Sequence, residues 1–206
     1  MTHISTYTSC AGGLAPLQAS LLDLEATSLL QRSYSPHLVT GLLQTRAYAT
    51  AVFSTCIDVL EVPDDIEQAV DTRLARQHLL GNPDHQFCFL LSEAALLRTV
   101  GSPEVMAEQL THLTALIGLA LPNVEIGIVG LKAPLVAPGA NFVVRDRSVD
   151  IETVIGITSS IDAVEVALAT RTFDRLSQLA VYGDEAFTIL QRALHSHISK
   201  PQTPKS

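Results

Sequence analysis

The chain has few cysteines, no long apolar run and no leader-like start, and each absence excludes a class of protein. Its three cysteines, Cys10, Cys56 and Cys88, lack the paired spacing of a zinc site or a disulfide framework. Reduced thiols of this kind are typical of a cytoplasmic protein. No apolar run approaches about 18 residues, and neither a basic region nor a signal-peptide core precedes Asp23 and Glu25. We therefore expect no membrane span and no export.

Positive charge is also scarce. The sequence has 13 Lys and Arg residues against 21 Asp and Glu residues, which gives a formal net charge of -8. The arginines are scattered over mixed helices and do not form the basic stripe that neutralises nucleic-acid phosphates. Autonomous DNA binding is therefore not expected.

Signatures of catalysis and metal binding are missing as well. There is no Gly-rich phosphate loop, no G-x-S-x-G elbow, no H-E-x-x-H motif and no acidic metal triplet. His195 and His197 form an H-x-H pair near the C-terminus, where a solvated pair is the expected interpretation. We predict neither a metal nor a cofactor.

The residues that are present predict one α+β domain. With 206 residues, 47% of them hydrophobic, the chain can bury one substantial core, which we place at residues 14–198. Residues 1–13 and 199–206 are polar and aperiodic and are expected to be flexible tails. Apolar periodicity predicts helices at 15–32, 40–54, 64–81, 92–99, 103–121, 162–182 and 184–198. Segments rich in Val and Ile predict strands at 86–91, 124–130, 141–146 and 149–157. The expected fold has a helical N-terminal half, a small mostly antiparallel sheet, and C-terminal helices packing on that sheet.

Three of the predicted helices place polar side chains in the middle of apolar faces. At about 100° per residue, the stretch "HLVTGLLQTRAYATAVF" puts Gln44 on the same half-circle as Tyr48. The next helix carries Arg73 and Gln77 at the centre of its apolar arc, and the following long helix carries Gln109. These side chains are predicted to point inward.

A buried amide without a partner costs about 1 to 3 kcal/mol, so these groups must be satisfied somewhere. They either bond to one another, to helix ends and to loop carbonyls, as a structural network, or they converge on an apolar pocket whose few polar groups orient a ligand. In the second case the candidate ligand-binding residues are Gln44, Tyr48, Arg73, Gln77, Glu93 and Gln109.

Glu93 stands where an apolar strand is predicted to turn into a short helix. Ser92 suits the cap position of that helix, with Glu93 in its positive first turn. Two other interpretations remain open: Glu93 is the anionic partner of Arg73, or it is a general acid or base whose pKa is raised by dry surroundings. It is the one candidate catalytic residue if the chain is an enzyme.

Five stretches in a fixed order carry a family resemblance: "LVTGLLQTRAYATAV", "RLARQHLL", "EAALLRTVGSPEVMAEQLTHL", "LPNVEIGIV" and "GANFVV". Together they resemble the C-terminal domain of actinobacterial helix-turn-helix regulators of the Xre type, including WhiJ-like regulators, from about Leu24 to Leu194. The chain departs from that pattern at Thr40, where a proline is usual, and in "VIGITSS", where an acidic residue is usual. The matching positions are Gly41, Leu42, Leu43, Gln44, Thr45, Arg73, Arg76, Gln77, Glu93, Met106, Gln109 and Leu110.

The resemblance implies an α+β domain that senses a small molecule or engages a small acidic partner protein. In the family a DNA-binding helix-turn-helix precedes this domain, whereas here only a short tail precedes Leu14, and the family offers no catalytic residues to carry across. We therefore expect a stand-alone regulatory domain that binds a small-molecule effector or a partner protein, with a homodimer possible. The alternative is a cofactor-free cyclase or isomerase of natural-product biosynthesis, in which Gln44, Gln77 or Glu93 polarises a carbonyl group.

Overall fold

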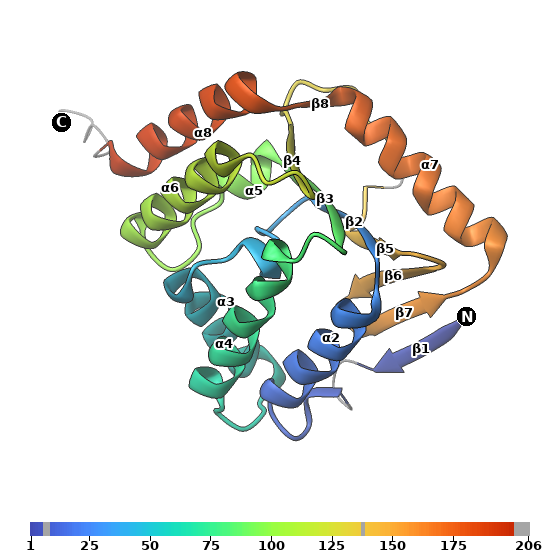
Figure 1. Ribbon diagram of the computed structural model, residues 1–206. Coiled ribbons are helices and arrows are strands. Elements are labelled where there is room, and N and C mark those ends of the chain that lie inside the picture. Colours follow the sequence, from blue (N-terminus) through green and yellow to red (C-terminus); the bar gives the residue numbers. More distant parts are fainter. Residues whose placement is uncertain (6–8, 137–138, 200–206) are drawn as a thin grey trace.

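The computed structural model describes residues 1–5, 9–136 and 139–199 and shows helices packed on both faces of one mixed sheet (Figure 1). The fold is α+β, as the sequence predicts. The helices are α2 (Ala15–Thr27), α3 (Arg46–Leu60), α4 (Ile66–Ala75), α5 (Glu93–Leu97), α6 (Pro103–Leu119), α7 (Ala163–Leu179) and α8 (Gly183–Ile198), with the 3-10 turns η1 (Gly41–Leu43) and η2 (Arg76–Gly81). The strands are β1 (Thr2–Ser5), β2 (Leu30–Ser35), β3 (Gln86–Ser92), β4 (Val124–Val129), β5 (Phe142–Arg145), β6 (Ser148–Thr153), β7 (Gly156–Ser160) and β8 (Ala180–Val181).

The strands follow the order β1-β7-β6-β5-β2-β3-β4-β8 across the sheet. The pairs β2–β3 and β3–β4 are parallel, and the remaining pairs are antiparallel. Strand β3 therefore lies between two parallel neighbours, a position in which both faces of a strand are covered. Successive side chains of a strand point to opposite faces, so Phe89 and Leu91 enter one core while Leu90 enters another.

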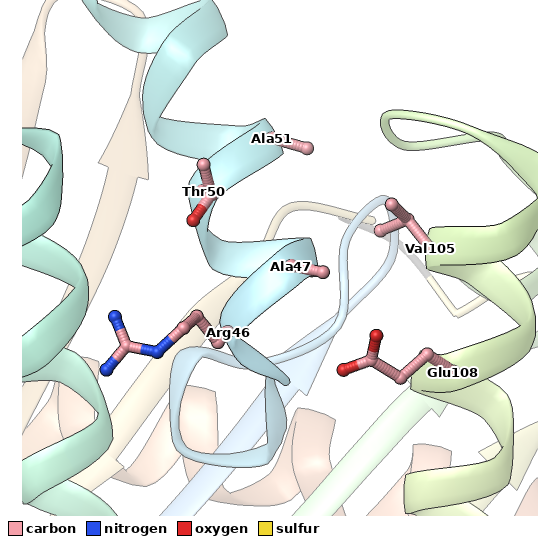
Figure 2. A pocket seen from close by; sticks show the side chains of 6 residues that line it. All are labelled: Arg46, Ala47, Thr50, Ala51, Val105 and Glu108. Carbon is pink, nitrogen blue, oxygen red and sulfur yellow. The ribbon is translucent and has the colours of Figure 1, made fainter.

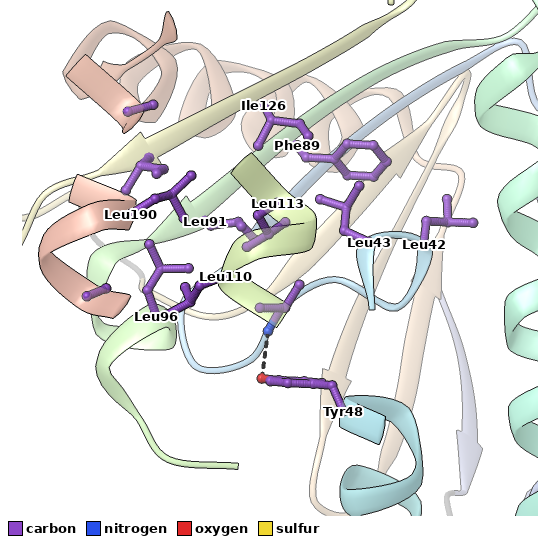
Figure 3. Packing of buried hydrophobic residues seen from close by; sticks show 14 of the residues in the cluster. Leu42, Leu43, Tyr48, Phe89, Leu91, Leu96, Leu110, Leu113, Ile126 and Leu190 are labelled. Carbon is purple, nitrogen blue, oxygen red and sulfur yellow. Dashed lines mark hydrogen bonds between the residues drawn. The ribbon is translucent and has the colours of Figure 1, made fainter. Parts of the chain in front are cut away.

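The largest core cluster lies between the sheet and the pair of helices α6 and α8, which run side by side (Figures 1 and 3). Phe89 and Ile126 come from the sheet, Leu110 from α6, Leu190 from α8 and Leu43 from η1. The 3-10 turn is therefore part of the core, and the segment around it is fixed by apolar packing. On the other face of the sheet, α7 packs through a separate cluster around Phe173 and Leu176.

Two predicted helix starts are confirmed. The Ser102 hydroxyl accepts a hydrogen bond from the Val105 N–H at 3.4 Å, and Pro103 occupies the first turn of α6. The Ser92 hydroxyl accepts from the Ala94 N–H at 3.2 Å and caps α5. Capping chemistry is local, so the sequence is sufficient to predict it.

The sequence does not predict strand β2, because the expected helix at 15–32 extends over its first residues. In the structure helix α2 ends at Thr27, and β2 begins at Leu30. Its inward-facing residues include Gln31 and Ser33, both of which are buried, so the strand shows no apolar alternation in the sequence. Gln31 accepts a hydrogen bond from Arg145 Nε at 3.2 Å across the sheet. The sheet is consequently larger and more mixed than the small antiparallel one expected, and it extends into the N-terminal half of the chain.

The ends of the chain also differ from expectation. Residues 2–5 pair antiparallel with β7, and Cys10 is buried, so the predicted tail at 1–13 is wrong for these residues. The strand predicted at 149–157 is two strands, β6 and β7, joined by a tight turn. The tail predicted at 199–206 lies, from residue 200 onward, outside the described residues.

Among the helices described here, none combines the length and the apolar character needed to cross a membrane.

Gly127 in β4 offers a test of this packing. A Cβ atom at this position would lie 2.6 Å from Tyr182 Cε1 and 2.8 Å from Leu90 Cδ2. We expect Gly127→Ala to lower the free energy of unfolding by about 1 to 3 kcal/mol through overpacking, measured by urea denaturation. The control is Gly81→Ala, because a Cβ there meets nothing within 4 Å. Equal stability of the two variants would contradict the packing of β4 described here.

Candidate functional site

The segment between β2 and α3, Val39–Thr45, is where most of the predicted polar residues meet. The predicted helix at 40–54 is wrong at its start, because η1 ends at Leu43 and Gln44 has an extended backbone with φ -84° and ψ 142°. Helix α3 begins only after Thr45, whose hydroxyl accepts from the Tyr48 N–H at 3.3 Å. Gln44 is nevertheless buried, at 3% exposure, because other elements cover the extended segment.

Gln109 of α6 holds the C-terminal end of this segment. Its Oε1 accepts from the Thr45 N–H at 2.8 Å, and its Nε2 donates to the Leu43 carbonyl oxygen at 2.7 Å. The side chain is completely buried. One amide thus satisfies a main-chain donor and a main-chain acceptor two residues apart, as a neighbouring strand would.

Three further side chains hold the rest of the segment. The Tyr48 hydroxyl accepts from the Val39 N–H at 3.1 Å (Figure 3), and Gln44 Nε2 donates to the Val39 carbonyl oxygen at 2.7 Å. Gln77 Nε2 donates to the Gln44 carbonyl oxygen at 2.6 Å. We call these side chains of Gln44, Tyr48, Gln77 and Gln109 the amide clamp. All four are predicted site residues, and the structure brings them to one stretch of backbone.

Arg73 of α4 contacts the amide clamp through the side chain of Gln44. Its Nη1 donates to Gln44 Oε1 at 2.6 Å, and its Nε donates to Gln18 Oε1 at 3.1 Å. The guanidinium carbon lies 4.0 Å from the centre of the Phe53 ring. Desolvation, followed by the nearby charge of Arg76, lowers the pKa of Arg73 to about 10.

Arg76 is the neighbouring cation, and its environment is different. Its Nε and Nη2 donate to Glu25 Oε2 and Oε1 at 2.7 and 2.6 Å, a bidentate ion pair, and its Nη1 donates to Gln18 Oε1 at 2.6 Å. The side chains of Arg76 and Glu25 are only 5% and 2% exposed. Arg76 is thus neutralised by a carboxylate, whereas the partners of Arg73 are two neutral amides and an aromatic ring.

Sequence reasoning did not assign Gln18 and Glu25 to the site. They lie seven residues apart on α2, so they share one face of that helix. A glutamate on the same helical face as several leucines and alanines was the available signal. Its partner, Arg76, is 51 residues away, and no local pattern connects the two.

Glu93 lies apart from the clamp, and the prediction that it partners Arg73 is wrong. Its Oε1 pairs with Arg192 Nη2 of α8 at 2.5 Å, and its Oε2 accepts from the Leu131 N–H at 2.9 Å. Burial by itself raises the pKa of this carboxyl, but the Leu131 hydrogen bond and the Arg192 charge outweigh burial and hold the pKa below its usual range. A general acid needs the opposite shift.

Open depressions lie elsewhere on the surface. One of about 580 Å³ separates α3 from α6, where Ala47, Ala51, Val105 and Glu108 face each other while Arg46 turns away toward Asp71 (Figure 2). Another, of about 490 Å³, runs along α7. Neither is lined by any of the six predicted ligand-binding residues.

The histidine pair near the C-terminus has protein partners. His197 Nε2 lies 2.8 Å from the Leu96 carbonyl oxygen, and His195 Nε2 lies 3.1 Å from the Ser199 hydroxyl. Within the part of the chain that the structure describes, no group of three or more His, Cys, Asp or Glu side chains is arranged to hold a metal ion.

A family model described as a domain of unknown function, DUF5753, matches residues 18–192. The chain belongs to this family. The match spans α2 to α8 and therefore contains the amide clamp, Arg73 and the Arg76–Glu25 pair. No curated protein matches the chain.

The clamp can be tested at Gln109. Gln109→Met keeps the volume of the side chain but leaves the Thr45 N–H and the Leu43 carbonyl buried without partners, at about 1 to 3 kcal/mol each. We expect a loss of about 2 to 6 kcal/mol in the free energy of unfolding, measured by urea denaturation. Gln68→Met on the exposed face of α4 is the matched control and should be near neutral. A neutral Gln109→Met variant would show that the clamp does not stabilise the fold.

Proposed function

We propose that this DUF5753 chain is a cytoplasmic regulatory recognition domain that binds a small-molecule effector or a partner protein and acts through another protein. Its sequence resemblance to the C-terminal domain of Xre-type, WhiJ-like regulators of actinobacteria supports this proposal. The observation that carries it is the amide clamp: the backbone of Val39–Thr45 is held by side chains from α3, η2 and α6.

A segment whose backbone is held by side chains can respond to a ligand that competes for those side chains. Side-chain hydrogen bonds can be exchanged one at a time for bonds to a ligand, whereas a strand ladder is lost only as a unit. Gln44 contributes both its side chain and its carbonyl oxygen to the clamp. A ligand that changes the partners of Gln44 or Arg73 therefore changes the free energy of this segment in its present conformation.

The distribution of charge supports action through another protein. The net charge of -8 opposes approach to nucleic acid, and several of the arginines are already paired with carboxylates, among them Arg46, Arg76, Arg145 and Arg192. The cyclase alternative receives no comparable support. Gln44 has both amide atoms bonded to protein groups, and Glu93 is held as an ion-paired carboxylate.

Native mass spectrometry of the chain purified from its own host tests the proposal. We expect a non-covalent adduct of constant mass, which persists on incubation because the domain binds without turnover. An adduct whose mass converts to that of a product would favour an enzyme instead. In parallel, mobility-shift assays with duplex DNA should show no sequence-specific complex, and such a complex formed by the isolated chain would contradict the proposal.

A further inference from the structure

The guanidinium of Arg73 has donors that the protein does not use. An arginine side chain carries five N–H groups, and here Nε and Nη1 each make one hydrogen bond, to Gln18 and Gln44. Among buried side-chain nitrogen and oxygen atoms of the described residues, only Ser33 Oγ lacks a partner. Because Nη2 of Arg73 also makes no hydrogen bond to these residues, Nη2 is not buried and reaches solvent. The end of the guanidinium is therefore open at Nη2, and the second N–H group of Nη1 makes no hydrogen bond to the described residues.

The open end is held in a fixed orientation. The Phe53 ring covers the guanidinium carbon at 4.0 Å, and a Cβ built on Gly41 would lie 3.5 Å from Arg73 Nε. The two amides that hold Arg73 are fixed in turn, since Gln18 also accepts from Arg76 and Gln44 also donates to Val39. A donor pair with its geometry already set loses little conformational entropy when a ligand binds.

No carboxylate of the described residues neutralises this cation at contact distance. The ion pairs in that part of the chain involve Arg46, Arg76, Arg145 and Arg192, and none involves Arg73. Glu152 on the exposed face of β6 is a more distant influence that favours the charged form of Arg73, as Glu25 also does. A half-buried guanidinium whose hydrogen-bond partners are neutral attracts an anion more strongly than a fully solvated one, because the local dielectric constant is lower.

We propose that the open end of Arg73 binds the carboxylate group of a small-molecule effector as a bidentate pair. This inference rests on the proposed function, since it names the chemistry of the effector. The bound carboxylate shares Nη1 with Gln44 Oε1, so occupation of the site is transmitted to the amide clamp through a single hydrogen bond.

Benzoate is a suitable probe, with benzamide as its neutral isostere, titrated at constant ionic strength against the full chain by calorimetry and by the side-chain NMR signal of the Arg73 Nε–H. We expect saturable binding of benzoate and none of benzamide. Arg73→Gln should weaken benzoate binding at least about tenfold, because it removes the charge and the donor fork. Glu152→Gln should tighten binding, because it removes a competing negative charge and leaves the clamp intact.

The outcomes separate this inference from the proposed function. Absence of saturable benzoate binding, equal binding by wild type and Arg73→Gln, or binding of benzamide as tight as that of benzoate would overturn the carboxylate site. If Arg73→Gln does not fold, Glu152→Gln decides, since unchanged or weaker binding by that variant contradicts the proposal. A host-derived effector without an acidic group would overturn the site and leave the regulatory function standing. Conversely, benzoate binding through Arg73 in a chain whose host-derived adduct is turned over would leave the site standing and overturn the function.

Discussion

The structure depends on satisfying the main-chain groups of Val39–Thr45, a mostly buried segment that pairs with no strand in the described part of the chain. Buried N–H and C=O groups must be paired, since each one left without a partner costs about 1 to 3 kcal/mol. The amide of Gln109 is suited to this task because it presents a donor and an acceptor at once, as a strand does. This requirement explains why a chain rich in leucine and alanine places glutamines at positions that the core surrounds.

A second constraint comes from two arginines brought to the same polar layer between α2, α4 and the sheet. Arg76 is neutralised by Glu25, whereas Arg73 is held by amides and by the Phe53 ring. The layer continues onto the sheet, where Arg145 pairs with Asp150 and donates to Gln31. Burial lowers the pKa of Arg145, while the carboxylate of Asp150 opposes that shift. Of these two neighbouring cations, Arg73 is therefore the one without a carboxylate partner among the described residues.

The sequence predicts the parts of this arrangement that depend on local chemistry. The caps at Ser92 and Ser102 and the apolar strand β3 follow from residue type and spacing. Gln44 is buried as its helical spacing predicts, but for a different reason, because helix α3 begins only after Thr45 and Gln44 lies in an extended segment. Strand β2 was missed because Gln31 and Ser33 are polar residues on its buried face, and their partners lie on other strands and helices.

The sequence also does not predict which charged residues pair when they lie far apart along the chain. Glu93 finds Arg192, 99 residues away, and not Arg73, which the sequence made equally plausible. Arg76 and Glu25 were not assigned to each other for the same reason. Which cation meets which carboxylate is decided by how α2, α5 and α8 pack, and helical periodicity gives only the face on which each residue lies.

The central claim is that side chains, together with the two main-chain hydrogen bonds of η1, protect the backbone of Val39–Thr45, which pairs with no strand of the described residues. Amide hydrogen exchange, followed residue by residue by NMR, tests it most directly. The account predicts that the Val39 and Thr45 amides exchange as slowly as the Phe89 amide in the middle of β3, because each donates to a buried side-chain oxygen. Exchange of both amides at the rate of an unstructured chain would contradict it.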